Sequence, residues 1–272
     1  MKQALQPIGV FDSGLGGISV LREIHRLLPT EDLIYVADSA HAPYGAKTPE
    51  YIRARCQQVA SFLLERGMKV LVVACNTATV HAVEYLRDIL PVPVVGMEPA
   101  VKPAARMTLT KVVGVLATQQ TVNSPRLQRL IQDYAQGIEV LTQACPGLVE
   151  HVEAGDFNSE AVKQLLSRYT LPFLDAQADT LVLGCTHYPF LLEAIQDVTH
   201  GRMTVLETSI PVTHQLIRIL DKYALRNPAE QQGVVNFFSS KAEKQHFASM
   251  QLLWQQPLVA QVLPLGYLGL SN

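Results

Sequence analysis

Two cysteines stand in matched surroundings, at positions 75 and 185. Residues 70–77 read Val-Leu-Val-Val-Ala-Cys-Asn-Thr, and residues 180–187 read Thr-Leu-Val-Leu-Gly-Cys-Thr-His. A lone cysteine after an apolar run is most often a small buried hydrophobic residue. Two cysteines in the same context favour chemistry, because a thiolate is a base and a nucleophile. One base on each side of a carbon is what inversion of a stereocentre by proton transfer requires. The pair therefore predicts two-base proton transfer.

A glycine-rich turn, Asp12-Ser13-Gly14-Leu15-Gly16-Gly17, follows the first apolar run. Its glycines would let the backbone approach a ligand closely and adopt positive φ. The spacing is not Gly-x-Gly-x-x-Gly, and no Lys-Ser/Thr pair follows as in a phosphate loop. Asp12 would repel a pyrophosphate, so it suits a ligand with an ammonium group, a general-base role or a helix cap.

Further candidates follow two other apolar runs. Pro43-Tyr44-Gly45 either walls a pocket or forms a tight turn. His187 could donate a hydrogen bond to a charge that arrives or leaves beside Cys185. No second His or Cys stands at ligand spacing around it, so we expect no metal. Cys56, on an apolar helical stripe, and Cys145, before Pro146, are expected to be structural.

Short apolar runs alternate along the chain with helical periodicity, which predicts an α/β protein with mainly parallel sheets flanked by helices. The expected strands are 8–11, 33–37, 70–74, 92–96, 112–117, 138–141, 180–184, 203–206 and 234–238. The expected helices are 18–28, 48–67, 78–89, 124–136, 159–175, 190–197, 210–222 and 241–252.

The two halves of the chain resemble each other. Residues 9–13 (Gly-Val-Phe-Asp-Ser) are weakly similar to residues 114–118 (Gly-Val-Leu-Ala-Thr), in addition to the two cysteine segments. This predicts two pseudo-symmetric α/β units, each with a cysteine at the carboxyl end of a strand. Open α/β sheets bind ligands at that edge. A following helix start should lower the pKa of each thiol.

Composition excludes several classes of protein. Of 272 residues, 48% are hydrophobic and 17% are charged, which is typical of a globular chain. The net charge of −2 argues against a nucleic-acid partner. We find no apolar run of about 18 residues and no secretory signal in Met1–Pro7, so we expect no membrane span. Four cysteines do not form a disulfide scaffold in so long a chain, and we expect a cytoplasmic protein.

These motifs together resemble the glutamate racemases of the aspartate/glutamate racemase superfamily, from the glycine-rich turn to about Thr208. The resemblance implies two similar α/β domains with the active site between them, formed by residues 1–98 plus 207–272 and by residues 99–206. It implies glutamate as the small-molecule substrate, no cofactor and no metal. It also implies supply of D-glutamate for peptidoglycan, hence for the cell wall and cell shape. A homodimer is the assembly that it suggests.

The resemblance also implies residue roles. Cys75 would take the proton from D-glutamate with help from Asp12, and Cys185 would take it from L-glutamate with help from His187. Glu153 matches an acidic family position near the site, with Glu150 close by as the other candidate. The expected substrate contacts are Asp12, Ser13, Tyr44, Gly45, Asn76, Thr77, Thr186 and His187.

The sequence departs from the family pattern at two places. At the late domain junction, Glu207 stands where the family pattern has aspartate. Only 11 residues precede Asp12, whereas some relatives have a longer extension associated with activation by a cell-wall precursor; this argues against such activation.

Three other functions remain open. An aspartate racemase could use the same two thiols. A non-enzymatic amino-acid-binding protein would need no thiol on either face. A cysteine hydrolase with His187 as base to Cys185 would leave Cys75 without a role.

Overall fold

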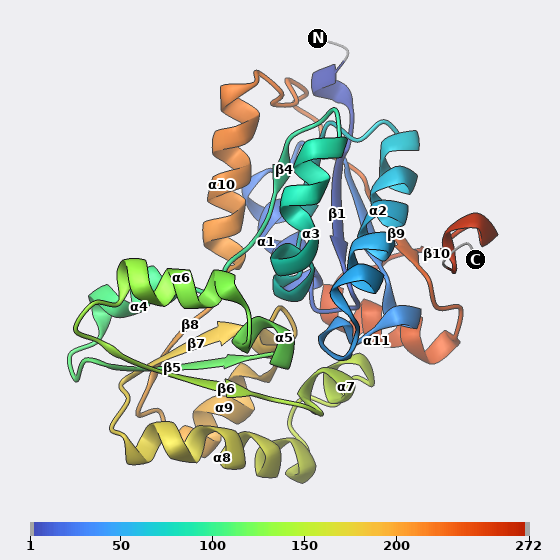
Figure 1. Cartoon of the computed structure of the whole chain (residues 1–272). Helices are drawn as coiled ribbons and strands as arrows, with labels where there is room; N and C mark the ends of the chain where they lie inside the picture. The colour runs from blue at the N-terminus through green and yellow to red at the C-terminus, as the bar shows by residue number, and fades with distance from the viewer. Residues whose placement is uncertain (1–2, 270–272) are drawn as a thin grey trace.

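The computed structural model describes residues 3–269 and contains two parallel sheets (Figure 1). The larger sheet has the order β10-β9-β2-β1-β3-β4, and every neighbouring pair is parallel. Its strands are β1 (Ile8–Asp12), β2 (Leu33–Ala37), β3 (Val70–Val73), β4 (Val94–Val95), β9 (Val235–Ser239) and β10 (Ala260–Val262).

The smaller sheet is parallel too and has the order β6-β5-β7-β8. Its strands are β5 (Val112–Ala117), β6 (Glu139–Ala144), β7 (Thr180–Gly184) and β8 (Thr204–Leu206). This order repeats the β2-β1-β3-β4 core of the larger sheet, so each strand has a counterpart four strands later in the chain. The predicted fold class, with two similar α/β units, is confirmed.

Helices cover both faces of each sheet (Figure 1). The larger sheet carries α1 (Ile18–Leu27), α10 (Ser209–Lys222) and α11 (Lys244–Trp254) on one face, and α2 (Pro49–Glu65) and α3 (Asn76–Ile89) on the other. The smaller sheet lies between α4 (Val101–Met107) with α6 (Pro125–Tyr134), and α8 (Glu160–Asp175) with α9 (Leu192–Thr199). Shorter elements are α5 (Gln119–Val122), α7 (Leu148–Glu153) and the 3-10 turns η1 (Gln3–Leu5), η2 (Ser39–His41), η3 (Tyr44–Ala46), η4 (Tyr188–Leu191) and η5 (Leu265–Tyr267).

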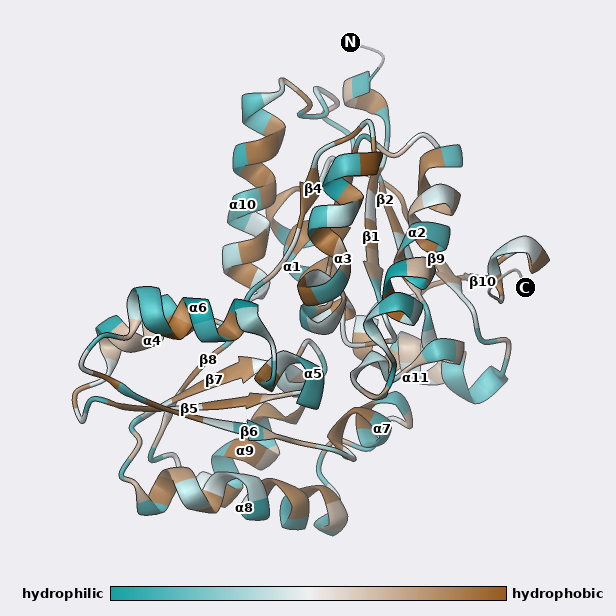
Figure 2. Ribbon diagram, viewed as in Figure 1, coloured by the Kyte–Doolittle hydropathy of each residue, from teal (hydrophilic) through white to brown (hydrophobic). Residues whose placement is uncertain are grey.

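Burial on both faces explains the continuous apolar runs. All residues of β1, β2, β3 and β7 are buried, as expected for central strands of a parallel sheet. Figure 2 shows the same arrangement as hydrophobic strands between helices whose outer sides are hydrophilic. Helix α2 begins as predicted, because the Thr48 side chain accepts a hydrogen bond from Tyr51 N at 3.3 Å and Pro49 takes the first helical position.

Several short elements differ from the sequence-based expectation. The expected strand 92–96 shrinks to Val94–Val95, since Pro91 and Pro93 have no N–H for a ladder. Helices α4, α5 and α7 and strand β10 were not predicted. They are short, and β10 is an edge strand with little buried surface, so none gives a clear periodicity.

The chain crosses from the larger sheet to the smaller one after β4 and returns after β8, with β9 and β10 closing the larger sheet. The domain limits at 98/99 and 206/207 stay a prediction, and residues 1–2 and 270–272 of the first predicted domain lie outside the described residues. Across residues 3–269, none of the helices combines the length and apolar composition needed to span a bilayer.

Candidate active site

Cys75 lies where β3 ends and α3 begins. It is the N-cap residue of α3, and its Sγ accepts a hydrogen bond from Ala78 N at 3.4 Å. Ser13 Oγ, at the end of the neighbouring strand β1, lies 3.5 Å from the same sulfur. Only 5% of Cys75 is exposed. The thiol is therefore held between two strand ends and turned away from bulk solvent.

Cys185 occupies the equivalent place in the smaller sheet, directly after β7. Its Sγ lies 3.7 Å from His187 Nδ1, and 6% of the residue is exposed. Both cysteines line one small, nearly closed cavity whose volume of about 10 Å³ is far below that of an open small-molecule site. Its other lining residues are Ser13, Pro43, Tyr44, Gly45, Asn76, Thr77, Thr118, Val149, Thr186 and His187.

His187 connects Cys185 to a carboxylate. Its Nε2 lies 2.7 Å from Glu153 Oε1, which also accepts a hydrogen bond from Leu15 N at 2.5 Å. Burial alone would lower the pKa of His187, but the hydrogen bonds to Cys185 and Glu153 raise that pKa well above its usual value. Burial by itself would raise the pKa of Glu153, but the hydrogen bond to His187 outweighs that effect and the pKa is lowered. A histidine with a raised pKa therefore lies between Cys185 and Glu153, and Gly16 N also lies 3.2 Å from its Nε2.

Of the two acidic candidates on α7, only Glu153 reaches His187. Glu150 is exposed and has no contact with His187; it lines a neighbouring hollow that Glu153 also lines and that shares Pro43 and Val149 with the cavity of the cysteines. The two residues are three apart on the same helix, but Glu153 is near its end, where it meets the glycine-rich turn.

Asp12 lies behind the cavity and does not line it. The side chain is fully buried, and its Oδ2 accepts hydrogen bonds from Gly17 N at 2.9 Å and Gly14 N at 3.3 Å. Its Oδ1 lies 3.5 Å from Thr186 Oγ1. Burial raises the pKa of Asp12, although nearby His187 opposes the shift. Asp12 therefore organises the turn and stays electrostatically coupled to the site; its contact with substrate stays a prediction.

The glycines of this turn serve a different purpose from the predicted one. Gly14, Gly16 and Gly17 do not adopt positive φ. A Cβ on Gly14 would overlap Glu153 Oε1, and a Cβ on Gly16 would overlap the His187 ring. Gly14 and Gly16 have no room for a side chain because Glu153 and His187, from the other half of the molecule, pack directly on their backbone.

Seven of the eight predicted ligand contacts line the cavity, and Asp12 is the exception. The side-chain amide of Asn76 is buried and, within the described chain, neither of its polar atoms has a hydrogen-bond partner, which leaves both free for a ligand. Sequence reasoning missed Thr118 and Val149. Thr118 could have been found, because it is the counterpart of Ser13 in the repeated segments; its Oγ1 lies 2.8 Å from Thr77 Oγ1. No signal in the sequence marks Val149.

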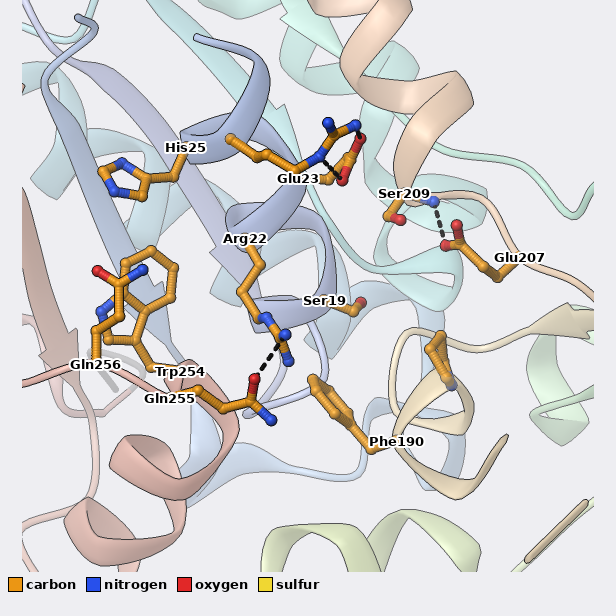
Figure 3. A pocket seen from close by; sticks show the side chains of 12 residues that line it. Ser19, Arg22, Glu23, His25, Phe190, Glu207, Ser209, Trp254, Gln255 and Gln256 are labelled. Atoms are coloured by element: carbon orange, nitrogen blue, oxygen red, sulfur yellow. Dashed lines mark hydrogen bonds and ion pairs between the residues drawn. The ribbon is translucent and has the colours of Figure 1, made fainter. Parts of the chain in front are cut away.

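A larger surface hollow opens elsewhere between α1, η4 and the end of α11 (Figure 3). Its charged side chains are paired with each other or with amides: Arg22 donates to Gln255 Oε1 at 2.8 Å, and Arg26 pairs with Glu23. Neither cysteine lines it. The larger hollow therefore offers neither thiol to a ligand, and the smaller cavity is the candidate active site.

The expected lowering of the Cys75 pKa by the helix start is wrong. Burial raises the pKa of this thiol, and the carboxylate of Asp12 adds to the effect. Because the thiolate is the reactive form, alkylation of Cys75 should increase about tenfold per pH unit. It should keep increasing above about pH 8.5, where an ordinary cysteine levels off. Peptide mass mapping after short iodoacetamide pulses measures this, with Cys75→Ala to assign the peptide. Labelling that is flat across this pH range would contradict it.

Comparisons with known proteins agree with this geometry. Residues 8–216 match the family described as Asp/Glu/Hydantoin racemase. The chain is 50% identical over 246 residues to the glutamate racemase of Herpetosiphon aurantiacus, covering 90% of this chain and 96% of that one. It is 49% identical over 259 residues to the glutamate racemase of Pseudomonas putida, covering 94% and 97%.

Solved structures give the same result. The glutamate racemase RacE1 of Bacillus anthracis superposes with a TM-score of 0.84 at 28% identity, covering 96% of this chain and 98% of that one. The Escherichia coli glutamate racemase, solved with L-glutamate and the activator UDP-MurNAc-Ala, has a TM-score of 0.83 at 30% identity, with coverages of 94% and 97%. The chain therefore belongs to the Asp/Glu/Hydantoin racemase family and, within it, to the glutamate racemases, which are isomerases.

Proposed function

We propose that this enzyme interconverts L- and D-glutamate by two-base proton transfer between Cys75 and Cys185, without a cofactor. The observation that carries the proposal is the position of the two thiols. They follow equivalent strands, β3 and β7, of two similar sheets, and both line one small cavity. A substrate carbon held between them would have one thiol on each face.

In this scheme one cysteine acts as thiolate and the other as thiol. Cys75 removes the α-proton of D-glutamate, the bonding electron pair stays on the α-carbon, and Cys185 delivers its own proton to the opposite face. The reaction of L-glutamate runs in reverse, from Cys185 to Cys75. After each turnover the two sulfurs have exchanged protonation states, and proton exchange with solvent resets them.

The residues around the sulfurs would stabilise the developing charge. The carbanion places extra negative charge on the substrate carboxylate, which fixed hydrogen-bond donors stabilise more than the ground state. Asn76, Thr77, Thr118 and Thr186 provide such donors in the cavity. The protonated His187, held by Glu153, would stabilise Cys185 as thiolate. A positioned base contributes about 10²- to 10⁴-fold, so these donors must supply much of the remaining rate.

Glutamate is the favoured substrate over aspartate because of the relatives. The Francisella tularensis glutamate racemase, solved with D-glutamate, has a TM-score of 0.83 at 29% identity, covering 96% of this chain and 98% of that one. The chain would then supply D-glutamate for peptidoglycan. A cytoplasmic location and a homodimer stay predictions.

The direct test is circular dichroism of L- or D-glutamate incubated with the purified enzyme and no added cofactor. We expect the signal of either enantiomer to decay to zero, at a rate that chelators leave unchanged. Aspartate should react at least about tenfold more slowly, because one methylene is worth about 1–3 kcal/mol of discrimination. Activity that appears only with added pyridoxal phosphate would contradict the cofactor-free scheme, and faster turnover of aspartate would reassign the substrate.

A further inference from the structure

Two ion pairs are almost completely buried in the half of the molecule that contains the larger sheet. One lies at the carboxyl ends of its strands and the other at their amino ends. Arg55 and Asp38 meet beyond the carboxyl end of β2, with both side chains 0% exposed. Lys69 and Glu31 meet before the amino ends of β3 and β2, with side chains 0% and 1% exposed. Only the first pair is near the cavity of the cysteines.

The Arg55–Asp38 pair is bonded to the substrate loop, by which we mean Pro43–Gly45. Arg55 donates from Nη2 to Asp38 Oδ1 at 2.6 Å and from Nε to Asp38 Oδ2 at 3.0 Å. The same Oδ2 accepts a hydrogen bond from the Tyr44 hydroxyl at 2.7 Å. Tyr44 itself is 1% exposed, and the three residues of the loop line the cavity.

Arg55 is fixed from its other side as well. Its Nη1 donates to Gln58 Oε1 at 2.5 Å, and its Nη2 also donates to the carbonyl of Tyr267 at 3.0 Å. The guanidinium is thus held by helix α2 and by the C-terminal turn η5. Because the Arg55 guanidinium is held in place and makes two parallel N–H···O bonds to Asp38, the Asp38 carboxylate has a single orientation.

Stability is a weak reason for such a pair. The free energy needed to remove two charges from water is about as large as the free energy gained from their attraction. Replacing a buried ion pair by apolar residues of similar volume therefore often leaves the stability of the fold unchanged. Tyr44 supplies a better reason. Burial, together with Asp38, raises the pKa of its phenol well above the usual value, so it stays a donor that needs a strong acceptor. A gripped carboxylate is such an acceptor.

We propose that Asp38 and Arg55 are positioning residues for substrate binding, which hold the Pro43–Gly45 loop in place through the Tyr44 hydroxyl. The proposal rests on the proposed racemase function, since it assigns the pair to binding of that substrate. It requires no contact between either residue and the substrate. Their effect should therefore appear in KM more than in kcat.

The test is a double-mutant cycle with Tyr44→Phe and Arg55→Lys, assayed with glutamate. Each single variant should raise KM roughly tenfold, as expected for loss of a hydrogen bond to a charged group. The value of kcat should change less than about threefold. The double variant should be no worse than the single variants, because both changes break the same chain of bonds. Lys69→Met is the matched control: it breaks the other buried pair and should lower Tm without changing KM.

A second measurement is independent of activity. Amide hydrogen exchange of residues 44–46 should accelerate in both Tyr44→Phe and Arg55→Lys, and should stay as in the unmodified protein in Lys69→Met. If Arg55→Lys does not fold, Tyr44→Phe alone still carries both readouts.

Unchanged KM and unchanged exchange in Tyr44→Phe would overturn the proposal, as would additive KM effects or an equal rise of KM in Lys69→Met. An unmodified enzyme that does not racemise glutamate would instead refute the proposed function, and the exchange data would still decide whether the pair positions the loop.

Discussion

Replacing either Cys75 or Cys185 by alanine is expected to stop racemisation in both directions, with a loss of about 10⁴-fold or more. Each direction needs one thiolate to remove the proton and one thiol to deliver another, so neither cysteine can substitute for its counterpart. The two thiols are separate on the chain but share one cavity. Circular dichroism of both enantiomers measures the loss.

Heavy water makes this prediction sharper. With the unmodified enzyme, early D-glutamate formed from L-glutamate in D₂O should carry deuterium at the α-carbon, while the remaining L-glutamate stays mostly undeuterated. In Cys185→Ala, Cys75 should still exchange the α-hydrogen of D-glutamate alone. In Cys75→Ala, Cys185 should exchange that of L-glutamate alone. Proton NMR of each enantiomer follows this exchange.

The matched control is Cys145→Ala. Cys145 is also a buried thiol in the smaller sheet's half, and burial raises its pKa to about 12, yet it does not line the cavity. Its loss should leave racemisation intact. Retention of the original hydrogen in early product, or racemisation by either cysteine variant at a normal rate, would show that a single base serves both faces.

The second large effect is expected from His187→Asn, which should lower kcat by roughly 10²- to 10³-fold with a much smaller change in KM. The ring lies 3.7 Å from Cys185 Sγ, and its hydrogen bonds to Cys185 and Glu153 raise its pKa well above the usual value, which favours the charged form. Its loss removes the cation that favours the thiolate. Asp12→Asn should lower kcat by less and for another reason. Its carboxylate holds the glycine-rich turn through Gly14 N and Gly17 N, and its charge raises the pKa of Cys75, so the change disturbs both the turn and the protonation of that thiol.

A pair of carboxamide variants separates charge from packing. Glu153→Gln keeps the shape of the side chain but removes the charge that sustains the imidazolium, so it should lower kcat in the same sense as His187→Asn. Glu150→Gln, three residues away on α7, is the control and should leave kcat unchanged, because Glu150 is exposed and does not meet His187. A rise in KM alone, in any of the three site variants, would make those residues binding groups only.

The sequence by itself determined the α/β class, the alternation of strands and helices, and the matched positions of the two cysteines. Central parallel strands are buried on both faces, so β1, β3 and β7 appear as continuous apolar runs that periodicity detects. A residue that directly follows such a strand must lie at the carboxyl edge of the sheet. The position of Cys75 and Cys185 at the carboxyl edges of their sheets was therefore predictable from local pattern alone.

Only the tertiary structure decided which side chains surround the thiols. Glu153 was distinguished from Glu150 by its contact with Leu15, 138 positions away, and Gly14 and Gly16 are glycines because Glu153 and His187 pack on them. The pKa of Cys75 also depends on residues and surfaces that are distant in the sequence. The helix start is a local feature that favours the thiolate, but burial and Asp12 outweigh it. Desolvation and contacts between distant residues depend on how the two halves close on each other, and no local pattern in the sequence records that closure.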